Sequence, residues 1–207
     1  MHLLLTDRLA CPRCGPRFGL ILRADRLESR VVLDGVLGCP NCRDSFPVAD
    51  GFADLRAPPR GELPKGLVGT PAAGERADRL VALLGIVRGP GTIALVGEPA
   101  RSAAAVASAI EDVQVVAVDP DMRLWPEEPG VSRLAASPGL PFFGSSLRAV
   151  AVDGRLGPAW LAEASRVVVP KGRVVVSHAP VDARDLLAEH GLTVLAAEAE
   201  TVVGARG

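Results

Sequence analysis

The four cysteines of this chain stand in two pairs whose spacing could hold a metal ion. Two residues lie between Cys11 and Cys14, two more lie between Cys39 and Cys42, and residues 15–38 separate the pairs. Two such turns let four thiolates converge on one tetrahedral zinc ion. Because protein would then fill every position around the metal, we predict structural zinc rather than a catalytic site with an open position for water.

Other uses of paired cysteines fit the sequence less well. A disulfide would need an oxidising compartment, whereas Leu3-Leu4-Leu5 is too short for a secretory signal. We therefore expect the cytoplasm, where thiols stay reduced. A redox centre of the thioredoxin type needs only one pair, placed where a strand leads into a helix. Because small metal-binding domains often fold only with their metal, zinc would also contribute to the folding free energy.

A second group of chemically capable residues follows short apolar runs in the C-terminal two thirds of the chain. Ligands of parallel sheets bind at the carboxyl ends of strands. There, Asp119 could contact a ligand or could simply begin a turn. His178 could act as a general base or could be an ordinary loop residue. The predicted strand-end residues are Gly97, Glu98, Asp119, Asp153 and His178.

The elements that must position these residues alternate between strand and helix. Such alternation of apolar strands and amphipathic helices favours a mostly parallel sheet with helices on both faces. The predicted strands cover residues 92–96, 113–118, 131–135, 147–152 and 173–177, with a final antiparallel pair at 193–197 and 200–203. The predicted helices cover residues 77–84, 103–110 and 159–165, with one more after Asp182.

Short strands and turns surround the cysteines. The apolar run Val31–Leu33 followed by Asp34-Gly35 predicts a hairpin that leads into the second cysteine pair. Residues 45–48 predict a short strand, which the turn pair Asp50-Gly51 ends.

The division of the chain follows its composition. Proline and glycine are frequent between residues 57 and 74, which is typical of a linker. We therefore predict a metal-binding domain over residues 1–56, a linker over 57–74 and an α/β domain over 75–207.

Composition argues against two classes of partner. The net charge is −1 and only 3% of residues are aromatic, so the chain has neither the basic field nor the stacking platforms of a typical nucleic-acid-binding protein. Residues 1–60 carry nine arginines against seven acidic residues, which is too balanced for a basic patch. No apolar run reaches the ~20 residues that span a bilayer, so we expect no membrane partner.

The cysteine pairs belong to a longer pattern. The chain reads LACPRC at residues 9–14, GCPNC at 38–42 and SFPVADGF at 45–52. Together these stretches resemble the small zinc-ribbon proteins that activate tRNA and protein methyltransferases. In that family the ribbon pairs a strand with a methyltransferase and keeps it soluble. The resemblance covers roughly residues 6–56 and implies a protein partner, either a methyltransferase or its substrate.

The second part of the chain carries a different set of motifs. It reads IALVG at residues 93–97, VVAVDP at 115–120, LPF at 140–142 and SRVVVPKGR at 165–173. In this order the stretches are similar to class I S-adenosylmethionine-dependent methyltransferases, which implies a Rossmann-like sheet and that cofactor. By this resemblance Gly97 begins the glycine loop, Glu98 lies near the methionine moiety and Asp119 binds the ribose.

The sequence also departs from that family. Glu98 and Pro99 follow Gly97 where the family has further glycines, and Ala136 or Ser137 stands where an acid reads the adenine. Two functions therefore stay open. The first is an S-adenosylmethionine-dependent methyltransferase-like protein with a fused activator-type ribbon and an unknown acceptor. The second is a non-catalytic scaffold that binds or activates a partner protein through the ribbon.

Overall fold

The computed structural model describes residues 1–63, 71–72 and 74–207. The predicted linker over residues 57–74 therefore lies partly outside the described residues. Among the described residues, no helix is both long enough and apolar enough to cross a membrane.

Five parallel strands form the centre of the main sheet. They are β7 (Arg88–Val96), β8 (Glu111–Val118), β9 (Val131–Ser137), β10 (Leu147–Asp153) and β11 (Val168–Ser177). Their order in space is β9-β8-β7-β10-β11, which is the strand order 3-2-1-4-5 of the doubly wound fold. A hairpin of β12 (Leu192–Glu198) and β13 (Thr201–Arg206) extends the sheet, with β13 antiparallel to β11. The predicted fold class is confirmed.

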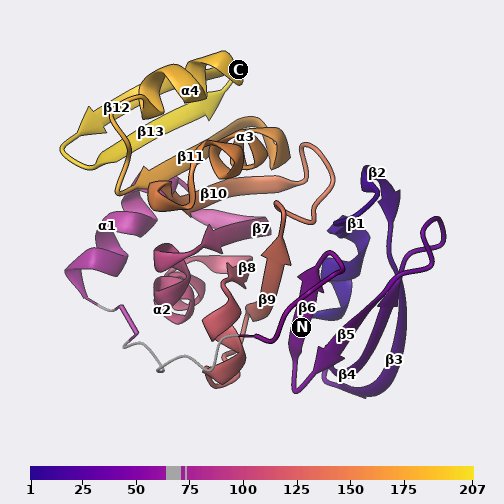
Figure 1. The fold of residues 1–207 in the computed structure, drawn as a ribbon. Helices are drawn as coiled ribbons and strands as arrows, with labels where there is room; N and C mark the ends of the chain where they lie inside the picture. Colours follow the sequence, from indigo (N-terminus) through magenta and orange to yellow (C-terminus); the bar gives the residue numbers. More distant parts are fainter. Residues whose placement is uncertain (64–70, 73) are drawn as a thin grey trace.

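Helices cover both faces of this sheet (Figure 1). On one face, α1 (Glu75–Leu84) and α2 (Ala103–Ala109) bury apolar residues against the sheet. On the other face, α3 (Pro158–Val167) and α4 (Ala183–Glu189) do the same. The central strands are apolar on both sides because both faces are covered, which explains why they appear in the sequence as continuous runs of valine, leucine and alanine.

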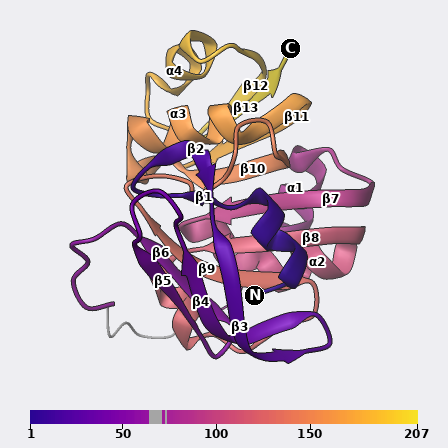
Figure 2. The same ribbon diagram turned by 90° about the vertical axis from the view of Figure 1, so that its right-hand side faces the viewer.

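The cysteine-containing part of the chain continues the same sheet (Figure 2). It contributes β3 (Ile21–Glu28), β4 (Val31–Gly38), β5 (Ser45–Ala49) and β6 (Phe52–Arg56), each antiparallel to the next. Strand β6 then pairs in parallel with β9, so that all eleven strands form one sheet. We refer to residues 1–56 as the ribbon.

Strand β6 is suited to this internal position because it buries a large apolar side chain on each face. Phe52 joins the core on the α1–α2 side, whereas Leu55 joins the core on the α3–α4 side. That second core is continuous across the junction, since Leu37 and Phe46 of the ribbon belong to the same cluster as Val116 in β8. The ribbon and the parallel sheet therefore share apolar packing as well as backbone hydrogen bonds.

The predicted hairpin turn at Asp34-Gly35 is wrong. The chain turns instead at Ser29 and Arg30, which take φ values of 45° and 66°, and Gly35 lies inside β4. Gly35 allows the backbone of β3 to approach closely, because a Cβ at this position would lie 2.5 Å from the carbonyl oxygen of Arg23. Neither turn residue is glycine or asparagine, so the usual signal of a two-residue hairpin is missing from the sequence.

Candidate functional site

The four thiols meet at the edge of the ribbon. Cys11 ends the short strand β1 (Ala10–Cys11), which pairs with β2 (Gly15–Gly19), and Cys39 follows β4 directly. The Sγ atoms of Cys11 and Cys42 are 3.7 Å apart, those of Cys14 and Cys39 are 3.8 Å apart, and all four lie within 4.8 Å of one another. A tetrahedron with Zn–S bonds of 2.3 Å has edges of about 3.8 Å. The cluster therefore suits structural zinc.

Local hydrogen bonds prepare these sulfurs for a cation. Burial acts to raise the pKa of Cys39, but the backbone amides of Cys42 and Asn41 and the neighbouring thiols lower it to about 7. Burial raises the pKa of Cys11 and of Cys42. The Asn41 side chain also donates to Cys14 Sγ at 3.3 Å. Because four thiolates this close repel one another, full ionisation needs a positive ion between them.

The predicted strand-end residues all reach one edge of the sheet. Val96 in β7 is in register with Val152 in β10, and Asp153 is in register with Ser177. The strand order changes direction between β7 and β10, which is where doubly wound sheets bind their ligands. Gly97 and Asp153 flank this crevice.

The side chains of Asp153 and Leu156 lie against Gly97. Its φ is +72°, and a Cβ built there would lie 3.0 Å from Asp153 Cβ and 3.1 Å from Leu156 Cδ1. The next residue, Glu98, begins the 3-10 helix η2 (Glu98–Ser102), and its Oε1 bonds to Arg76 of α1 at 2.9 Å. The backbone that a cofactor would approach is therefore in contact with Asp153 and Leu156.

Asp119 lies at the end of β8 and caps the 3-10 helix η3 (Pro120–Leu124). Its Oδ1 accepts from the Asp121 amide at 2.8 Å, and no bond to its Oδ2 is found among the described residues. Burial raises the pKa of Asp119, and the nearby charges of Asp121 and Asp153 add to that rise. One carboxylate oxygen is thus available to a hydroxyl donor.

Of the three residues predicted to bind the cofactor, Glu98 lines a cleft of the described part of the chain. A cleft of about 520 Å³ is lined by Glu98 but by neither Gly97 nor Asp119. Ala136, where an adenine-reading acid was sought, is buried, and Ser137 is exposed at the end of β9. The binding of S-adenosylmethionine by Gly97, Glu98 and Asp119 therefore stays a prediction.

Two features escaped the sequence analysis. The first is a partner for His178, whose Nδ1 lies 3.6 Å from Asp153 Oδ1. Both residues were identified as strand-end residues, and their pairing follows from the adjacency of β10 and β11. The second is Arg133, a buried arginine that bonds to backbone carbonyls of Asp50, Met122 and Trp125. The sequence feature that could have indicated this role is the presence of an arginine inside an apolar strand.

Comparison with known protein families gives a match in the ribbon. Residues 2–51 match the family model described as Trm112p-like protein. The ribbon is therefore similar to that family. Comparison with curated proteins gives no match.

Several solved structures resemble the chain in fold. One is a complex between the Haloferax volcanii Trm112 methyltransferase activator and a candidate methyltransferase, with 16% identity, a TM-score of 0.49, and coverage of 62% of this chain and 88% of that one. Another is precorrin-6y C5,15-methyltransferase from Geobacter metallireducens, with 14% identity, a TM-score of 0.49, and coverage of 64% and 88%. A third is a TehB-like methyltransferase from Corynebacterium glutamicum, with 12% identity, a TM-score of 0.48, and coverage of 63% and 88%.

Proposed function

We propose that this methyltransferase-like protein is a non-catalytic scaffold whose Trm112p-like ribbon stabilises its own sheet. The pairing of β6 with β9 is the observation that carries this proposal. Ala53 and Leu55 lie opposite Leu134 and Ala136, so the ribbon strand is already hydrogen-bonded within the chain. A ribbon engaged in this way acts in cis, and a separate protein partner would have to use another surface.

The crevice at the change of strand order supports the scaffold part of the proposal. Leu156 and Asp153 lie against the backbone of Gly97, where close approach of a cofactor would be needed.

The four cysteines are free thiols suited to zinc, and we infer that the protein works in the cytoplasm, where such thiols stay reduced.

Titration calorimetry with S-adenosylmethionine and with its demethylated product tests the scaffold. We expect no saturable heat from either compound at millimolar concentration, in a sample whose zinc content shows that the ribbon is intact. Saturable heat from either compound would refute the scaffold and would establish a cofactor site.

A second candidate is an active S-adenosylmethionine-dependent methyltransferase. Asp119 favours it, because its Oδ2 accepts no bond from the residues that the structure describes and a carboxylate at the end of the second strand can accept from ribose hydroxyls. This function requires the Leu156 side chain to move away from Gly97. Leu156→Ala should then strengthen binding of the cofactor, and Asp119→Ala should abolish it. If neither variant changes the heat, the second candidate is wrong.

A further inference from the structure

A cleft beside the crevice is lined by four parts of the chain, one of which is the turn between β12 and β13. The cleft of about 520 Å³ lies between α1, the loop after β7 and the carboxyl end of β11, and its lining includes Arg79, Glu98, His178 and Thr201. This volume is within the range of about 300–1,000 Å³ that small-molecule sites occupy. The cleft also lies at the edge of the sheet where parallel folds place their ligands.

His178 is held in an unusual position on the wall of this cleft. Its φ is +46°, a left-handed conformation that side-chain-bearing residues seldom adopt outside functional sites and turns. Its Nδ1 is buried and has no hydrogen-bond partner in the part of the chain that the structure describes, although Asp153 Oδ1 is 3.6 Å away. Contacts between an acid and a histidine are often longer before a ligand binds than afterwards.

The carboxylate behind His178 stays charged. Asp153 is only 5% exposed and accepts from Arg155 Nε at 3.0 Å and from Arg155 Nη2 at 2.7 Å. Burial acts to raise the pKa of Asp153, but the bonds from Arg155 outweigh it and hold that pKa below its usual value. The Nδ1 side of the His178 ring therefore faces a fixed anion, and Nε2 is the ring nitrogen that does not face Asp153.

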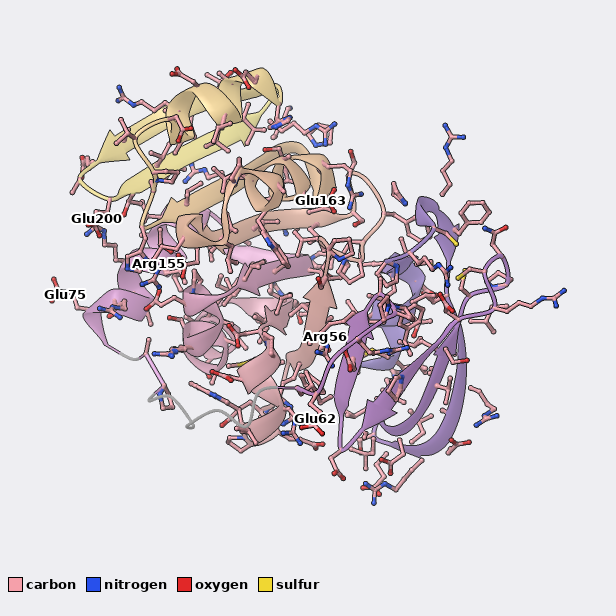
Figure 3. All side chains as sticks on the ribbon, in the orientation of Figure 1. Arg56, Glu62, Glu75, Arg155, Glu163 and Glu200 are labelled. Atoms are coloured by element: carbon pink, nitrogen blue, oxygen red, sulfur yellow. The ribbon has the colours of Figure 1, made fainter. Side chains whose placement is uncertain are left out.

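The acidic groups of the cleft already have cationic neighbours. Glu98 forms an ion pair with Arg76 at 2.9 Å. Glu200 lies at the same edge as Arg155, as Figure 3 shows, and the two side chains attract each other. By contrast, Arg79 has no ion pair or hydrogen bond among the described residues and is exposed at the cleft. Among the described residues that line the cleft, Arg79 and His178 are therefore the basic side chains not already paired with Glu98.

We propose that this cleft binds a small molecule that bears a carboxylate or phosphate group, held by Arg79 and His178. Guanidinium and imidazole N–H groups are effective donors to such oxyanions. Asp153 is a positioning residue, because it lies behind the His178 ring and outside the cleft lining. The proposal does not depend on the scaffold, since none of these three residues is needed for the pairing of the ribbon with the sheet.

Protection of His178 from diethyl pyrocarbonate tests the site, with inorganic phosphate and acetate as separate probes. The rate of modification is measured by mass spectrometry of the peptides, with His190 in the same chain as the internal reference. We expect at least one probe to slow modification of His178 severalfold and to leave His190 unchanged. Protection by phosphate alone or acetate alone would identify the anion class. Equal rates with and without both probes would overturn the proposal.

Two variants locate the contacts. Arg79→Gln should abolish protection, whereas Arg184→Gln, an exposed arginine on α4, should retain it. Asp153→Asn should raise the probe concentration that gives half-protection, because the ring loses the charge that orients it. If Arg79→Gln still shows full protection, the anion does not bind in this cleft. If Asp153→Asn leaves the half-protecting concentration unchanged, Asp153 does not position His178.

Discussion

At the scale of single residues, the zinc cluster makes the sharpest demand on the chain. The Sγ atoms of Cys14 and Cys39 stand 3.8 Å apart, which is the edge that a tetrahedral zinc site requires. Cys39→Ser removes one ligand and should reduce bound zinc well below one ion per chain, measured by elemental analysis. Arg17→Gln, an exposed change in the same ribbon, is the control. Stoichiometric zinc in the Cys39→Ser protein would contradict the four-cysteine site.

Arg133 joins the ribbon to the parallel sheet through backbone carbonyls. It is 6% exposed, and its guanidinium reaches the carbonyl of Asp50 in the ribbon and those of Met122 and Trp125 beside β8. Arg133→Met leaves these carbonyls without their donor and should lower the free energy of unfolding by about 3 kcal/mol. The exposed change Arg123→Met should alter it by no more than about 0.5 kcal/mol. Urea unfolding of both variants measures the difference. Equal midpoints would show that the hydrogen bonds of Arg133 do not contribute to the free energy of unfolding.

Asp119 should reduce stability at neutral pH. Its pKa in the folded protein is raised above 3.8, chiefly by burial, so the ionised form is less favourable in the folded chain than in the unfolded chain. The resulting loss of stability is absent below the pKa that Asp119 has in the unfolded chain. It is complete once the pH has risen past the pKa of Asp119 in the folded protein. Asp119→Asn should therefore stabilise the protein at pH 7 and have no effect near pH 3. Thermal unfolding at both pH values checks this, and a destabilised variant at pH 7 would reverse the inference.

At the scale of elements, the pairing of β6 with β9 decides how the ribbon is held. Leu55 of β6 is fully buried in the core shared by both parts of the chain. Leu55→Ala should cost about 2–5 kcal/mol of unfolding free energy. The matched change Leu27→Ala, on the outer strand β3 where the side chain is 49% exposed, should cost far less.

Hydrogen exchange adds a second measurement of the same pairing. In the unsubstituted protein the amides of β9 should exchange as slowly as those of β8, because β6 covers the far side of β9. Leu55→Ala should speed exchange in β9 more than in β8. Fast exchange of β9 in the unsubstituted protein would mean that the ribbon is not stably paired.

The sequence predicted most of these elements because their signals are local. Each of the five parallel strands contains its predicted apolar run, and α1 begins and ends close to its predicted limits. The turn at Ser29-Arg30 was missed because neither residue type signals a positive φ. The pairing of β6 with β9 was beyond reach, since it depends on a contact between segments far apart in the chain. The packing of Leu156 on Gly97 could not be predicted either, because no sequence motif indicates that contact.

At the scale of the whole molecule, one sheet and a shared core link metal binding to the stability of the complete chain. The cluster that contains Cys11 and Cys39 also contains Val150 and Leu161 of the parallel part. Zinc removal by a chelator should therefore lower the melting temperature of the whole chain in a single transition. Calorimetry with and without chelator measures this. Two separate transitions, with β10 and α3 still protected from exchange, would show that the two parts unfold independently.

The parallel pairing of β6 with β9 also sets an order of events during translation. The ribosome releases β6 early, but its neighbour in the finished sheet emerges only after β7 and β8 have been made. Until then β6 has a bare backbone edge, which is a template for misassembly. Any nascent chain that stalls before residue 131 keeps that edge open, so we expect chaperones and proteases to act on such fragments while sparing the full-length product.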